Sequence, residues 1–147
     1  MVESLQEFLL KNNYSKAKLH LTKTNHFEII VKVNGKKGRF ILDTGASYSI
    51  VNVERATQFD VVIEDDEVKL AGAGGIHMDA KISKQNTIGI GQWTQKKMRL
   101  VVFNMTQLNA ALISQDTNPV DGIIGADVLK KSKAIIDYHK KYLYLKR

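Results

Sequence analysis

The segment FILDTGASYSIV, residues 40–51, places a carboxylate, a small hydroxyl and a glycine directly after an apolar stretch. A carboxylate in such a place could take part in general acid–base chemistry. Burying a lone carboxylate is costly unless it is paired, hydrogen-bonded or protonated, so Asp43 requires an explanation. Gly45 permits a close approach of the backbone, and its N–H can then face the carboxylate. The simpler alternative is an Asx-type turn, in which Asp43 and Gly45 only reverse the chain.

The elements that position Asp43 are predicted from the spacing of apolar residues. Apolar residues alternate with others over 27–33, which is the period of a β-strand. Asn34 and Gly35 then form a turn signal, and the chain returns through Phe40 and Leu42. The stretch 24–43 is therefore predicted to be a hairpin that delivers Asp43.

The rest of the chain is predicted to be mainly strands. Ser4 and Glu7 have the spacing of a capping box, which predicts a short N-terminal helix. A second hairpin is expected, with strands at 61–70 and 76–82 and its tip at the glycine-rich residues 71–75. Further strands are predicted at 87–91, 98–103, 134–138 and 142–146, with a helical turn at 52–58, an exposed loop at 114–122 and a short helix in 121–131.

Length and composition indicate one domain with a hydrophobic core. The chain has 147 residues, of which 44% are apolar and 25% charged, with no apolar run approaching the length of a membrane span. Cysteine is absent, which excludes disulfides and thiolate chemistry. The fold class is predicted as mainly β with two or three short helices.

The net charge of the chain and its first ten residues indicate which partners and which cellular location to expect. The formal charge is +7, but the 22 basic residues are spread from Lys11 to Arg147, so a solvated surface is favoured over nucleic-acid binding. The start, MVESLQEFLL, lacks the pattern of a secretory signal. A cytoplasmic location is the default expectation, and an exported one stays open if a signal was removed.

The ordered combination of ILDTGAS, a glycine-bearing hairpin and GIIGADVL resembles the retropepsin-like aspartic proteases, in particular their single-domain, non-viral members. The resemblance covers residues 24–147 and implies an acid protease barrel with one lobe per chain. Residues 1–23 are expected to form an N-terminal extension with the short helix. The family hydrolyses peptide bonds without a metal or other cofactor, so none is expected here.

The resemblance implies roles for the matching residues. Asp43 is expected to be catalytic, and because the chain has a single DTG triplet, the active form is expected to be a homodimer that pairs Asp43 from two subunits. The expected supporting residues are Thr44, Gly45, Ile123, Ile124 and Gly125. The expected substrate-binding residues are Ala46 and Ser47, with the flap residues Gly72, Ala73, Gly74 and Gly75, and the segment 123–124 is a further candidate wall.

The residue that follows the triplet bears on the expected pH optimum. Ala46 follows the glycine where serine or threonine would add a hydroxyl donor to the charged pair. An activity optimum in mildly acidic conditions, rather than at very low pH, is therefore predicted.

A role in binding, without catalysis, is the main alternative function. The same fold can hold a peptide or act as a dimeric scaffold with little or no hydrolysis. The acidic run EDDE lacks the spacing of an EF-hand calcium loop, and the four histidines lack metal spacing. Trp93 is expected in the core, and KKSK at 130–133 on the polar face of a short helix. The partners expected are a peptide or protein substrate and a second copy of the chain, with no nucleic acid and no membrane span.

Overall fold

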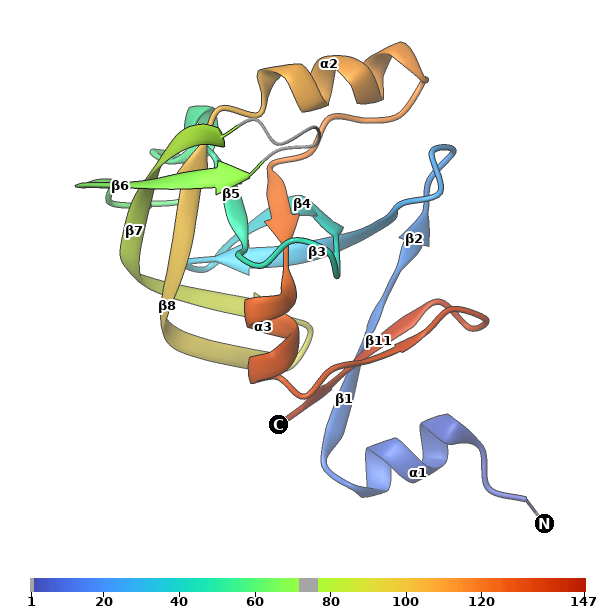
Figure 1. Ribbon diagram of the computed structural model, residues 1–147. Coiled ribbons are helices and arrows are strands. Elements are labelled where there is room, and N and C mark those ends of the chain that lie inside the picture. Colours follow the sequence, from blue (N-terminus) through green and yellow to red (C-terminus); the bar gives the residue numbers. More distant parts are fainter. Residues whose placement is uncertain (1, 72–76) are drawn as a thin grey trace.

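The computed structural model describes the backbone of residues 2–71 and 77–147, and their side chains outside 65–71 and 77–79. The described helices are α1 (Leu5–Lys11), the short 3-10 helix η1 (Val53–Arg55), α2 (Thr106–Ser114) and α3 (Ala126–Lys131). The strands are β1 (Tyr14–Lys18), β2 (His20–Leu21), β3 (Phe27–Val33), β4 (Lys36–Leu42), β5 (Ile50–Asn52), β6 (Glu64–Ala71), β7 (His77–Ile90), β8 (Trp93–Phe103), β9 (Gly122–Ile124), β10 (Ile135–Asp137) and β11 (Tyr142–Lys146). The predicted mainly β fold with short helices is confirmed (Figure 1).

Six strands form a closed barrel. The large sheet runs in the order β2-β3-β4-β9-β5-β8-β7-β6, and an additional pairing joins β3 to β7. This pairing, at Lys32 with Gly89 and Val33 with Ile88, closes the ring β3-β4-β9-β5-β8-β7. Closure removes free edges from the barrel itself, and β2 and β6 continue the sheet outside the ring.

The hairpin of β3 and β4 forms as the sequence predicts. In β3 the residues Phe27, Ile29, Val31 and Val33 are buried and alternate with more exposed ones. The turn places both Asn34 and Gly35 at positive φ, 52° and 85°, as a two-residue hairpin turn that follows the strand twist requires. The register pairs Phe27 with Leu42, so the hairpin ends directly before Asp43.

One apolar core fills the barrel. It contains Phe40, Leu42 and Ile124 from the strands next to Asp43, and Trp93 is 5% exposed within it. The prediction of Trp93 as a core residue is therefore confirmed. The strands that lead to Asp43 are held by this buried surface, which provides the main favourable term in folding.

A second, three-stranded sheet joins the two ends of the chain. Its order is β1-β11-β10, with Tyr14 opposite Lys146. Ser4 caps the start of helix α1, and its side chain accepts a hydrogen bond from the Glu7 N–H, as predicted. Figure 1 shows α1 and this sheet beside the barrel, on the opposite side of the molecule from α2. Within the described ranges, 2–71 and 77–147, no helix has the length and apolarity needed to cross a membrane.

Several elements differ from the predictions, among them β7 and α2. The segments predicted near 76–82 and 87–91 belong to one strand, β7, whose register shifts between Ser83 and Asn86. Both side chains are buried polar groups, and the Asn86 Nδ2 donates to the Ser83 Oγ and the Met98 carbonyl. This polar interruption breaks the apolar alternation without ending the strand. Helix α2 was not predicted by any pattern.

Candidate active site

Asp43 lies at the end of β4, where the barrel opens. Its N–H donates to the Ile124 carbonyl at 2.9 Å, which continues the parallel pairing of β4 with β9 by one step. Asp43, Thr44 and Gly45 are exposed in the single chain. Asp43 is therefore not a buried, unpaired carboxylate, although it follows a core strand. The strand carries it to the surface.

The turn after Asp43 orients its carboxylate. The Gly45 N–H donates to Asp43 Oδ1 at 2.9 Å, and the Ala46 N–H donates to the Asp43 carbonyl at 3.2 Å. The first of these bonds has the form of an Asx turn. The same bond directs a backbone N–H at the carboxylate. One hydrogen bond therefore both forms the turn and orients the Asp43 side chain.

The segment after β9 braces this loop through an unusually close backbone approach. The Ala126 N–H donates to the Ala46 carbonyl at 2.7 Å. A Cβ atom placed on Gly125 would lie 2.6 Å from that same carbonyl oxygen and 2.9 Å from the Tyr48 carbonyl oxygen. Position 125 therefore requires glycine because of the space available rather than because of its backbone angles.

A buried hydrogen-bond chain fixes the far side of the loop. The Gly125 N–H donates to the Ser49 Oγ at 2.9 Å, and the Ser49 hydroxyl donates to Asp127 Oδ1 at 2.7 Å. The Asp127 carboxylate also accepts from the N–H groups of Ser49 at 3.0 Å and Val128 at 2.8 Å. Ser49 is 0% exposed, so the chain is shielded from water. These bonds tie residues 43–49 to the start of α3.

The residues predicted at the site fall into three groups. Asp43 to Ser47 form one continuous loop, and Ile124 and Gly125 contact it from β9 through the bonds above. Ile123 is partly buried, whereas Ile124 is 0% exposed inside the barrel and cannot line a cleft. The predicted flap residues, Gly72, Ala73, Gly74 and Gly75, lie outside the described residues. Within the described part of the chain, the Thr44 hydroxyl has no hydrogen-bond partner.

A small apolar cluster borders Asp43 on the outer face of the sheet. Ile41, on β4, packs with Met105 and Leu112 of the α2 region, and Ile123 lies against the same cluster. Phe40 and Leu42 face the barrel core, so the alternation along the strand places Asp43 on the side of Ile41. The α2 region thus packs against the strand that leads to Asp43.

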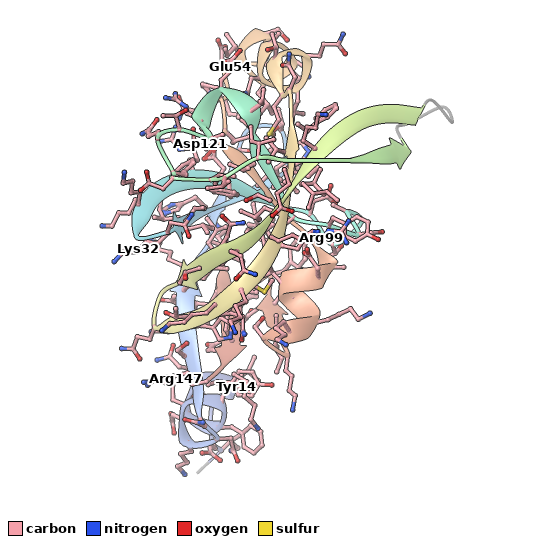
Figure 2. The ribbon with its side chains drawn as sticks, turned by 90° about the vertical axis from the view of Figure 1, so that its left-hand side faces the viewer. Tyr14, Lys32, Glu54, Arg99, Asp121 and Arg147 are labelled. Carbon is pink, nitrogen blue, oxygen red and sulfur yellow. The ribbon has the colours of Figure 1, made fainter. Side chains whose placement is uncertain are left out.

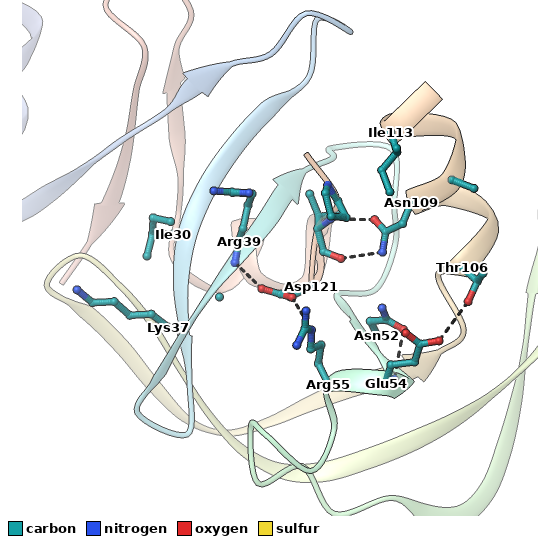
Figure 3. A pocket seen from close by; sticks show the side chains of 14 residues that line it. Ile30, Lys37, Arg39, Asn52, Glu54, Arg55, Thr106, Asn109, Ile113 and Asp121 are labelled. Atoms are coloured by element: carbon teal, nitrogen blue, oxygen red, sulfur yellow. Dashed lines mark hydrogen bonds and ion pairs between the residues drawn. The ribbon is translucent and has the colours of Figure 1, made fainter. Parts of the chain in front are cut away.

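A pocket of about 830 Å³ lies beside α2, and Figure 3 shows its side chains. Asp121 is at its centre, accepting from the Arg39 N–H at 2.9 Å and forming an ion pair with the Arg55 guanidinium at 3.1 Å. The Asn109 amide forms two hydrogen bonds with the Val120 backbone, at 3.0 and 2.8 Å. None of residues 43–49 lines this pocket, so it is separate from the Asp43 loop.

The aspartyl protease family profile matches residues 29–128. The chain belongs to this family. Among curated proteins, no sequence is similar enough to count as a significant match.

Solved structures support the retropepsin-like fold. The chain is similar to a retropepsin-like aspartic protease from Rickettsia conorii, with 23% identity, 90% coverage of each chain and a TM-score of 0.62. It is also similar to the EIAV protease in complex with the inhibitor HBY-793, with 18% identity, coverage of 80% of this chain and 98% of that one, and a TM-score of 0.55. The retroviral protease-like domain of Ddi1 from Leishmania major gives 17% identity, coverage of 80% and 86%, and a TM-score of 0.55. The predicted retropepsin-like fold is confirmed.

Proposed function

We propose that this chain is an aspartic endopeptidase whose active site contains Asp43 from each of two identical subunits. The observation that carries this proposal is the exposed Asp43 carboxylate, held at the open end of the barrel by the Gly45 N–H. Membership of the aspartyl protease family supports the reaction class. A single DTG triplet per chain supports a site shared across a two-fold axis.

The chemistry requires one base and one acid. Two carboxylates about 3 Å apart cannot both ionise cheaply, so the pair holds one proton and titrates as a unit. The ionised carboxylate removes a proton from a water molecule, which attacks the carbonyl carbon of the peptide bond. The protonated carboxyl donates to the carbonyl oxygen, and the departing amine then takes up a proton as the C–N bond breaks. Neither a covalent intermediate nor a cofactor is needed.

The substrate is proposed to lie extended across the two loops. Ala46, Ser47 and Ile123 are the described residues proposed to contact it, and the glycine-rich segment 72–75 is proposed to close over it. Ile124 is excluded from this set because its side chain is inside the barrel core. Gly125 and the Ser49–Asp127 pair are proposed to keep the loop rigid.

The test compares the wild-type chain with Asp43→Asn on a diverse peptide library from pH 3 to 8. Cleavage that disappears in Asp43→Asn, with an optimum in mildly acidic conditions, is the expected result. Maximal turnover below about pH 3 would contradict the prediction drawn from Ala46. If neither protein cleaves while both are folded and dimeric, the proposal fails, and a peptide-binding or scaffold role takes its place.

A further inference from the structure

A hollow of about 630 Å³ lies beside the active-site loop, on the side of α3. It is lined by Ser47, Tyr48, Ala126, Asp127, Lys130 and Lys131. Ser47 and Tyr48 follow the Asp43 turn directly in the chain, and the remaining residues belong to α3. The hollow therefore connects the loop that carries Asp43 with the basic end of a helix.

Lys130 lines two hollows beside the active-site loop. It lines the hollow just described and also a second one of about 380 Å³, which Thr44 borders. The Ala126 N–H bond to the Ala46 carbonyl, at 2.7 Å, fixes the start of α3 against the same loop. The position of Lys130 is thus coupled to the loop through one turn of helix.

The charge of the hollow is positive. Lys130 and Lys131 are exposed, and neither forms a salt bridge with another residue in the part of the chain that the structure describes. The one acidic group in the lining is Asp127, whose two oxygens already accept hydrogen bonds from Ser49 and Val128. A third cation contacts one of the lining residues, because the Arg99 guanidinium lies 5.7 Å from the centre of the Tyr48 ring.

Figure 2 shows Arg99 between α3 and the hairpin of β6 and β7. Strand β8 is held there by the Val101 N–H, which donates to the Ser49 carbonyl at 3.0 Å. Two lysines of α3 thus line the hollow with Ser47 and Tyr48, and a third cation, Arg99 of β8, lies over the Tyr48 ring. Such an arrangement attracts an anion more strongly than separate surface lysines do, because their potentials add.

We propose that this hollow binds a carboxylate of the substrate, so that peptides with an acidic residue on one side of the scissile bond are cleaved preferentially. The inference rests on the proposed function, because it takes the substrate to be a peptide bound across the Asp43 loop. The carboxylate can come from an acidic side chain or from the end of a peptide, and the chemistry of the hollow is the same for both.

The experiment uses one library-derived cleavage site and varies its flanking positions. Each of four positions on either side carries Glu, Gln or Lys in turn, in peptides with free or amidated C-termini. At pH 6, kcat/KM is expected to be about fivefold higher with Glu than with Gln at one or two positions, mainly through KM. The preference should decline below about pH 4, where the glutamate of the peptide becomes protonated, and it should weaken with added salt. A preference that follows the free C-terminus instead assigns the hollow to chain ends.

Variants separate the hollow from the general charge of the protein. Lys130→Gln with Lys131→Gln is expected to abolish the preference, and Lys130→Glu with Lys131→Glu to favour Lys over Gln. The matched control, Lys96→Gln with Lys140→Gln, changes two exposed lysines outside the hollow and should retain the preference. Equal rates for Glu, Gln and Lys at every position, with no effect of the free C-terminus, would overturn the inference. So would a preference that survives in Lys130→Gln with Lys131→Gln.

A binding measurement keeps this test independent of catalysis. Fluorescence anisotropy with the Asp43→Asn chain compares the Glu and Gln peptides without cleavage, at the same pH and ionic strength. Tighter binding of the Glu peptide that is lost in the lysine variants supports the hollow even if the wild-type chain cleaves nothing. Equal binding alongside normal wild-type cleavage overturns the hollow and leaves the proposed function intact.

Discussion

Replacing Ser49 by alanine removes the central hydroxyl of the chain that braces the active-site loop. The Gly125 N–H, which donates to the Ser49 Oγ at 2.9 Å, would lose its partner inside a fully buried site. Asp127 Oδ1 would lose the shorter of its bonds from Ser49, at 2.7 Å. An unsatisfied buried donor costs about 1–3 kcal/mol, and a hydrogen bond to a charged group contributes about 1.5–3 kcal/mol. Because the two losses share one atom they do not add fully, and a decrease of about 2–4 kcal/mol in the free energy of unfolding is expected.

The assay is urea unfolding at a fixed chain concentration, since dimerisation would otherwise shift the apparent stability. In a thermal scan the same change should lower the midpoint by roughly 5–15 °C. Ser114→Ala is the matched control, because the Ser114 hydroxyl donates at 2.7 Å to Ala111 but is exposed at the end of α2. Its effect should stay within about 0.5 kcal/mol. If Ser49→Ala behaves like Ser114→Ala, the brace does not hold the loop and the reasoning is refuted.

Three further outcomes are expected. Mixing wild-type chains with an equal amount of Asp43→Asn chains should halve the activity per wild-type chain, since random pairing puts about half of the wild-type chains into mixed dimers; unchanged activity would argue for a site within one chain. Gly122→Ala should lower the free energy of unfolding in urea by about 2 kcal/mol or more, because the new Cβ would overlap the Ile50 carbonyl oxygen. The control, Gly89→Ala, adds a Cβ that meets only ordinary contacts, and it should lower the free energy of unfolding by less than about 1 kcal/mol. Equal losses in the two variants would show that the close approach at Gly122 is not the cause. Burial raises the pKa of the Tyr144 hydroxyl, which disfavours its ionised form in the folded chain. The free energy of unfolding should therefore be unaffected by this group below pH 10 and fall as pH rises through the raised pKa. Tyr144→Phe should remove that fall from a plot of the free energy of unfolding against pH.

The parts of the fold that local patterns specify could be predicted from the sequence. The β3–β4 hairpin was predictable because alternation and the Asn34–Gly35 turn point to the same register. The DTG loop and the GIIG segment were predictable as partners only through the family resemblance. Their contact is a hydrogen bond between Asp43 and Ile124, which no periodicity links.

The rest depends on contacts between distant residues. Ser49 and Asp127 are 78 positions apart, and although Asp127 lies within GIIGADVL, nothing in that motif marks it as the partner of Ser49. The signal that could have suggested Asp127 is its place in the first turn of a helix, where an acidic side chain is favoured. Helix α2 is preceded by Met105, which provides no side-chain cap, and it buries only Leu112, so its sequence carries a weak helical signal. Its position depends on packing against Ile41 and on the Asn109 bonds to Val120, which are tertiary interactions.

The pairing of β1 with β11 has a consequence for the order of folding during synthesis. Ser15 bonds to Leu145, 130 positions further along, and β11 supplies Leu143 and Leu145 to the barrel core. The core therefore stays incomplete until the ribosome has released β11, and contacts of such long range form slowly. A chain whose β11 has not yet emerged cannot present a finished barrel to a second copy. If the active site needs two finished barrels, hydrolysis cannot begin before β11 has joined the core of both chains.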